Sequence, residues 1–168
     1  MKFGILSDSH DNFWRMEEAL PHLQQCGAVL HCGELISPFM VKQLADGLGD
    51  IPVHLVWGNN DGDHRAVAEL AAKSGSFKLY GELAVLNIEG LRIAINHYPE
   101  IGKSLAQSGE YNLVCFGNNH IASLQEINDT VLLNPGEILG LNGRSTMVLF
   151  DLNTRQSEFI ELYSSQAD

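Results

Sequence analysis

Basic residues are scarce in this sequence. Its 168 residues include 10 lysines and arginines against 21 aspartates and glutamates, which gives a formal net charge of −11. Proteins that bind long nucleic acids neutralise phosphates with many Lys and Arg side chains. The composition therefore argues against a long nucleic acid as partner. The same excess of acids argues against an anionic substrate, unless bound cations set the local field of the site.

Long apolar runs and cysteines are also few. No stretch approaches the roughly 20 apolar residues that cross a bilayer. The apolar run at the N-terminus is too short for a secretory signal, because an acid follows it at Asp8. The three cysteines, Cys26, Cys32 and Cys115, have no zinc-finger spacing, so we expect buried thiols that serve packing. These absences predict a cytoplasmic protein that does not enter a membrane.

The residues that are present suffice for a core. Of the chain, 45% is apolar and 18% is charged, and no repeat or linker divides it, so we expect a single domain over residues 1–168. The first half alternates strands at 2–6, 28–31 and 53–57 with helices at 13–25, after Ser37-Pro38, and at 64–72. The second half has hairpins at 83–88/91–96, 123–127/131–133 and 146–151/157–162, a helix at 101–108 and a strand at 113–116. This pattern predicts a mixed α/β fold of two packed sheets with helices outside.

Polar clusters follow five of the predicted strands. They are Ser7-Asp8-Ser9-His10-Asp11-Asn12, His31-Cys32-Gly33-Glu34, Gly58-Asn59-Asn60-Asp61, His97, and Gly117-Asn118-Asn119-His120. Any one cluster could be an ordinary turn, since Asp, Asn and Gly are common turn formers, and His31 could be a satisfied core histidine. Five clusters at five strand ends favour one shared site, because ligands bind beyond the carboxyl ends of strands in α/β sheets. Oxygen and imidazole donors suit Mn, Fe, Zn or Mg.

Three other histidines, His22, His54 and His64, lie in or beside predicted regular structure. We expect them to be structural.

The motif series resembles that of a known family. Asp8-x-His10, Gly33-Glu34, Gly58-Asn59-Asn60-Asp61, His97 and Gly117-x-x-His120 are similar, in order, to the motifs of the calcineurin-like metallophosphoesterase superfamily. The similarity is greatest to its small bacterial and archaeal phosphodiesterases without a cap domain, and it extends to the turn Asn134-Pro135-Gly136-Glu137. The resemblance implies a four-layer α-β-β-α sandwich of two mixed sheets flanked by helices, with a dinuclear metal site on one rim. It also implies hydrolysis of a small phosphoester through metal-bound hydroxide.

The resemblance assigns roles by motif. Asp8, His10 and His120 would hold the first metal, and Asn59 and His97 the second. Position 34 would bridge the two metals, and position 118 would add a ligand to the second. Asp8, His10, Asn59 and His97 would take part in catalysis. The cofactor would be one or two divalent ions, with Mn as the first choice and Fe, Zn, Mg or Ni as alternatives.

Two positions depart from the family pattern, and a third, Asn60, matches the small phosphodiesterase branch, which also tends to lack a histidine there. The bridging residue is Glu34 instead of Asp, and the expected second-site histidine is Asn118, whose amide oxygen is a weaker donor for transition metals. Asn60 occupies the position where some relatives carry a histidine that acts as general acid. We therefore expect one retained metal site and a second that is weakened. The alternative function is a catalytically impaired binding or scaffold protein of the same fold, as in the retromer complex. Relatives of this size often self-associate, which leaves a homo-oligomer open.

Overall fold

Two mixed β-sheets form the centre of the structure, a computed structural model that describes residues 1–163. The first sheet has the strand order β11-β10-β1-β2-β3-β4, and the second has the order β5-β6-β7-β9-β8. The strands of the first sheet are β1 (Lys2–Leu6), β2 (Ala28–His31), β3 (Val53–Leu55), β4 (Phe77–Leu79), β10 (Ser145–Asp151) and β11 (Ser157–Leu162). Those of the second are β5 (Leu83–Ile88), β6 (Leu91–Asn96), β7 (Leu113–Cys115), β8 (Ser123–Ile127) and β9 (Thr130–Asn134).

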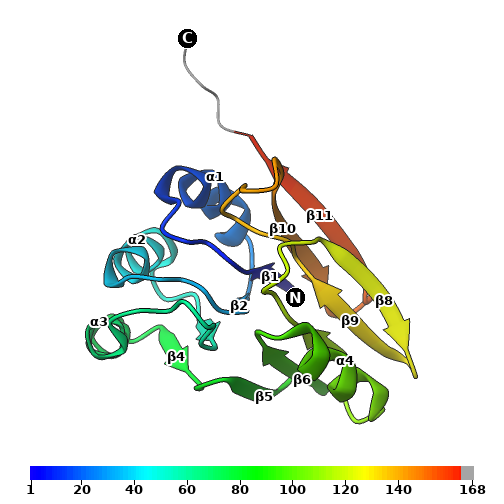
Figure 1. Ribbon diagram of the computed structural model, residues 1–168. Coiled ribbons are helices and arrows are strands. Elements are labelled where there is room, and N and C mark those ends of the chain that lie inside the picture. Colours follow the sequence, from blue (N-terminus) through cyan, green and yellow to red (C-terminus); the bar gives the residue numbers. More distant parts are fainter. Residues whose placement is uncertain (164–168) are drawn as a thin grey trace.

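Helices cover the outer faces of both sheets. Helices α1 (Phe13–Leu23), α2 (Pro38–Leu48) and α3 (His64–Ser74) lie together on one side of the molecule, and α4 (Pro99–Gln107) lies on the other (Figure 1). Along β1, Phe3 and Ile5 belong to the core between the sheets, whereas Leu6 belongs to the core under α1–α3. A third, smaller core lies under α4. The predicted four-layer α-β-β-α sandwich is confirmed.

Local sequence signals account for the helix starts. The Asn12 side chain accepts from the Arg15 amide at the start of α1, and Ser37 accepts from the Phe39 amide at the start of α2, where Pro38 takes the first helical position. The first helix, expected to end at about Gln25, ends two residues earlier at Leu23. The last predicted helix starts two residues earlier than expected, at Pro99.

Strand β4 was not predicted. It has only three residues, with the exposed Lys78 between Phe77 and Leu79, so its alternation is too short to show a period. It pairs in parallel with β3 at the edge of the first sheet. The strand expected at 53–57 is also shorter, because Val56 and Trp57 leave the ladder after Leu55.

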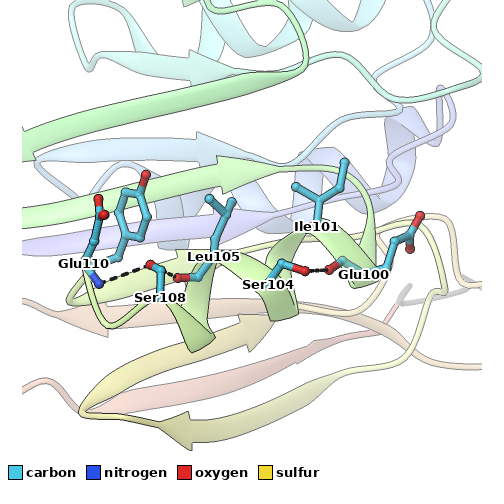
Figure 2. A pocket seen from close by; sticks show the side chains of 7 residues that line it. Glu100, Ile101, Ser104, Leu105, Ser108 and Glu110 are labelled. Atoms are coloured by element: carbon cyan, nitrogen blue, oxygen red, sulfur yellow. Dashed lines mark hydrogen bonds between the residues drawn. The ribbon is translucent and has the colours of Figure 1, made fainter.

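The single helix over the second sheet leaves a groove along its length. This groove, of about 480 Å³, is lined by Glu100, Ile101, Ser104, Leu105, Ser108, Glu110 and Tyr111 (Figure 2). Two of its serines hydrogen-bond within α4, Ser104 to the Glu100 carbonyl and Ser108 to the Leu105 carbonyl. None of the predicted metal ligands lines it.

Parallel pairing brings the predicted functional loops to one edge. Strands β1, β2 and β3 are mutually parallel, as are β6, β7 and β9. Their carboxyl ends carry the loops that hold the polar clusters, and the Gly117 amide donates to the carbonyl of His97 across two of these loops. Among the helices of residues 1–163, none has the length and apolar character needed to cross a membrane.

Candidate metal centre

Four of the predicted ligands converge at the ends of three strands. Asp8 and His10 follow β1, Glu34 follows β2 and His120 follows β7. One donor atom from each of the four lies within 4.8 Å of the others. Asp8 and Glu34 are buried, while His10 and His120 are partly exposed at the rim. We name this set the first cluster.

The other three predicted ligands lie next to the first cluster. His97 follows β6, and its Nε2 lies 3.7 Å from Oε1 of Glu34. The Asn118 side-chain amide donates to Oδ1 of Asn59 at 2.7 Å, so these two also touch. We name His97, Asn59 and Asn118 the second cluster. The structure therefore brings all seven residues together on one rim, and their role as metal ligands stays a prediction.

Glu34 lies between the two clusters and faces both. Its Oε2 is 2.6 Å from Nε2 of His10 in the first cluster, and its Oε1 faces His97 in the second. Oε1 also accepts from the backbone amide of Asn60 at 3.1 Å and from its side-chain amide at 2.7 Å. Asn60, to which the sequence assigned no role, thus holds the carboxylate in place.

Two imidazoles have a second partner that orients them. Nδ1 of His97 lies 2.7 Å from the carbonyl oxygen of Cys32, and Nδ1 of His120 lies 2.7 Å from Oε2 of the buried Glu137. A carbonyl oxygen only accepts hydrogen bonds, so Nδ1 of His97 carries a proton, and in the neutral ring Nε2 has the lone pair. This arrangement is typical of metal-binding histidines in proteins.

Several buried atoms aimed into the site make no hydrogen bond of normal geometry within residues 1–163. They are Asp8 Oδ1, His97 Nε2 and His10 Nε2, the last of which lies 2.6 Å from the Glu34 carboxylate. His120 Nε2 lies 3.3 Å from Asp8 Oδ1, and burial raises the pKa of the Asp8 carboxyl. Buried polar atoms are nearly always paired, so a set of unpaired donor atoms at one point fits a bound cation. The residues present are thus suited to a divalent metal.

The backbone of the site is strained. Five of the seven residues have positive φ angles: Asp8 53°, His10 43°, Glu34 58°, Asn118 70° and His120 60°. Such conformations cost non-glycine residues about 1–3 kcal/mol each and gather at functional sites. Gly117 allows the loops to approach closely, since a Cβ there would lie 2.7 Å from Asp8 Oδ2. The convergence of these side chains thus comes with a local cost in backbone stability.

Asp61 ties two of these loops together. Its Oδ2 accepts from the amides of Gly58 at 2.7 Å and Glu34 at 3.0 Å, and its Oδ1 accepts from the Ile36 amide at 2.8 Å. The sequence placed Asp61 in a motif but gave it no role, as it did for Glu137. Asp61 is contacted by backbone amides of the loop after β2, and Glu137 by the ring of His120. Contacts between residues so far apart in the chain leave no local pattern in the sequence.

The remaining histidines lie outside the two clusters. His31 is fully buried and bonded to the Gly33 amide and to Ser9 Oγ, and burial lowers its pKa to about 4, as fits a satisfied core histidine. His54 pairs with the Tyr80 hydroxyl, and the His64 ring stacks on Trp57. His22, in the last turn of α1, is half-buried.

Comparisons with known proteins agree with this geometry. A family model described as a calcineurin-like phosphoesterase superfamily domain matches residues 1–155. A phosphodiesterase of Methanocaldococcus jannaschii is 28% identical over 167 residues, which cover 96% of this chain and 98% of that protein. A probable metallophosphoesterase of Methanothermobacter thermautotrophicus is 27% identical over 161 residues, 89% of this chain and 85% of that protein.

A solved structure described as a novel archaeal phosphodiesterase superposes with a TM-score of 0.89 at 28% identity. The alignment covers 96% of this chain and all of that one (100%). Because the family match spans most of the sequence and the strand-end motifs meet at one rim, the chain belongs to the calcineurin-like phosphoesterase superfamily.

Proposed function

We propose that this protein is a metal-dependent phosphodiesterase that hydrolyses a small phosphoester, with one strong and one weak metal site. The observation that carries the proposal is the convergence of donor atoms from Asp8, His10, Glu34 and His120 within 4.8 Å. Family membership and the similarity to archaeal phosphodiesterases support the same reaction class.

The chain's residues divide between the two sites. Asp8, His10 and His120 would hold the first ion, Asn59 and His97 the second, and the two oxygens of Glu34 would reach both. When bound, such cations polarise phosphate oxygens and lower the pKa of a coordinated water. The protein's own part is to fix these ligands on a strained backbone and to keep Nε2 of His97 and His120 facing inward. We propose Mn²⁺ as the cation.

The weak second site follows from Asn118. Its side-chain amide donates to Oδ1 of Asn59 at 2.7 Å, so the proposed ligand oxygen of Asn59 already accepts a hydrogen bond. An imidazole at position 118 would offer a lone pair in place of this N–H donor. The second ion would therefore have fewer and weaker ligands than the first.

The site also lacks an evident proton donor for the leaving group. Asn60 occupies the position from which a histidine could act, and both its amides are bonded to Glu34. An amide does not supply a proton at neutral pH. We therefore expect faster turnover of esters with acidic leaving groups, such as nitrophenyl esters, than of alkyl esters.

The test combines metal content with turnover. Mn²⁺ binding is measured by calorimetry, and hydrolysis of bis(4-nitrophenyl) phosphate by absorbance. We expect one tightly bound Mn²⁺ per chain and Mn²⁺-dependent turnover, and loss of both in Asp8→Asn. Binding of less than one ion together with no turnover would overturn the proposal.

Glu34 and Asn118 also favour a second candidate, a scaffold protein with a residual metal site. The double variant Glu34→Asp, Asn118→His separates the two. A second bound ion and a large increase in rate would show that the natural site is weakened. If neither metal content nor rate changes, the proposal of one strong and one weak site is wrong. If the protein is inactive both before and after the exchange, the scaffold function is supported.

A further inference from the structure

A second groove opens beside His120, and we propose that it is the subsite for one ester group of the substrate. The group it selects is a neutral, planar one with hydrogen-bonding edges, such as a nucleoside. This inference rests on the proposed phosphodiesterase function, because a diester at the metal centre has two organic groups to accommodate.

The position of this groove connects it to the metal centre. It has a volume of about 490 Å³, and His120 of the first cluster forms part of its wall. One side is the loop after β7, with Asn119, Ile121 and Ala122, and the other is the loop before and at the start of β10, with Asn142 and Arg144. The volume is in the range of small-molecule sites. A diester at His120 would have this hollow beside it.

The walls of the groove are fixed by hydrogen bonds. Asn119 Oδ1 accepts from the Ile121 amide at 3.1 Å and from the Asn134 side chain at 2.8 Å. On the opposite side, the Asn142 amide donates to Oε1 of Glu137 at 2.7 Å, and Glu137 is the residue that orients His120. A preformed subsite loses little conformational entropy when it binds.

The lining combines apolar, amide and guanidinium groups. Ile121 is 62% exposed, which provides an apolar surface, and Asn119 and Asn142 provide carboxamides. Arg144 adds a planar cation that stacks on rings and donates hydrogen bonds. Its Nη2 lies 3.0 Å from Glu161, so much of its charge is already balanced. This pairing favours a neutral ring over a second phosphate.

The experiment compares two diesters that share a leaving group. Thymidine 5′-(4-nitrophenyl phosphate) and methyl 4-nitrophenyl phosphate both release nitrophenol, but only the first has a group large enough to occupy the groove. We expect kcat/KM for the thymidine diester to be higher by about tenfold or more, mainly through a lower KM. Arg144→Met and Asn142→Ala should each reduce this ratio by at least about fivefold. Ile101→Ala, in the groove of Figure 2, is the matched control and should leave the ratio unchanged.

The result that overturns the inference differs from the one that overturns the function. Equal kcat/KM for the two diesters, or an unchanged ratio in both groove variants, would rule out the subsite while the phosphodiesterase stands. If neither diester is hydrolysed, the proposed function fails. In that case, thymidine 5′-phosphate is titrated into ¹⁵N-labelled protein. Shifts at Ile121, Ala122 and Asn142 would support the groove, and their absence would exclude it.

Discussion

At the residue scale, Glu137 connects the candidate metal centre to the loop behind it. Its two oxygens, each 2.7 Å from its partner, accept from His120 Nδ1 and from the Asn142 amide. In Glu137→Gln an NH2 group replaces one of these oxygens, and it cannot accept from the donor that it faces. We expect Glu137→Gln to weaken Mn²⁺ binding by about 10- to 100-fold, as is usual when a partner of a metal-binding histidine is lost. Calorimetric titration of the metal-free protein measures the change.

A matched variant shows whether the loss of Mn²⁺ affinity is specific to Glu137 or follows from any Glu→Gln exchange. Glu110 is an exposed glutamate that pairs with Arg92 at 3.1 Å and lines the groove along α4, so Glu110→Gln makes the same chemical change away from the candidate metal centre. Its Mn²⁺ affinity should equal that of the wild type. Undiminished affinity in a folded Glu137→Gln protein would show that Glu137 does not position His120.

At the element scale, Asp61 joins the loop after β2 to the loop after β3. Three backbone amides donate to its carboxylate, and one of them belongs to Glu34. We expect Asp61→Ala to lower the free energy of unfolding by about 1–3 kcal/mol, because three partly buried amides lose their acceptor. It should also weaken Mn²⁺ binding, because Glu34 loses its anchor. Urea denaturation and calorimetry give the two quantities.

Asp63 offers the control for that experiment. It lies two residues further along and caps α3 by accepting from the Ala66 amide at 3.1 Å. Asp63→Ala should cost about 1 kcal/mol of stability, as for other helix caps, with no change in metal affinity. If both variants lost affinity equally, the loop connection through Asp61 would not be the cause.

Elements also show how far the sequence could predict this molecule. The mixed α/β fold of two packed sheets and the meeting of Asp8, Glu34 and His120 at one rim follow from strand periodicity and from polar residues at strand ends, whereas the four-layer sandwich was implied by the family resemblance. Strand β4 was missed because three residues hold no measurable period. The roles of Asn60 and Glu137 were missed because they depend on which distant atoms the folded loops bring within reach.

At the scale of the whole molecule, part of the acidic composition is concentrated at the candidate metal centre. The chain carries a formal charge of −11, and its rim holds the carboxylates Asp8 and Glu34 together with Glu137 behind them. Without a cation this rim repels a phosphoester. If the protein is the proposed phosphodiesterase, its substrate affinity should therefore depend on metal occupancy, because bound cations would offset the carboxylates of the rim.

The packing of the two sheets also makes stability depend on pH. His54 lies on β3 between Val53 and Leu55, which face α2 and α3, so its ring faces the other side, where it bonds to the Tyr80 hydroxyl. Burial and the neighbouring Lys78 lower its pKa to about 4, from 6.5 in an unfolded chain. Between these values the unfolded chain binds a proton that the folded protein does not. The contribution of His54 to stability is therefore fully present above pH 6.5 and is lost as the pH drops towards 4.

Replacement of His54 by a residue that does not titrate isolates this contribution. Between pH 7.5 and pH 5, the wild type should lose about 1–2 kcal/mol more of its unfolding free energy than His54→Gln does, because glutamine does not take up a proton. Urea denaturation in EDTA measures it without a contribution from bound metal. In Lys78→Met the wild-type loss should shrink, because the cation that helps to keep His54 neutral is gone. Parallel stability curves for His54→Gln and the wild type would show that the ring is protonated as readily in the folded protein as in the unfolded chain.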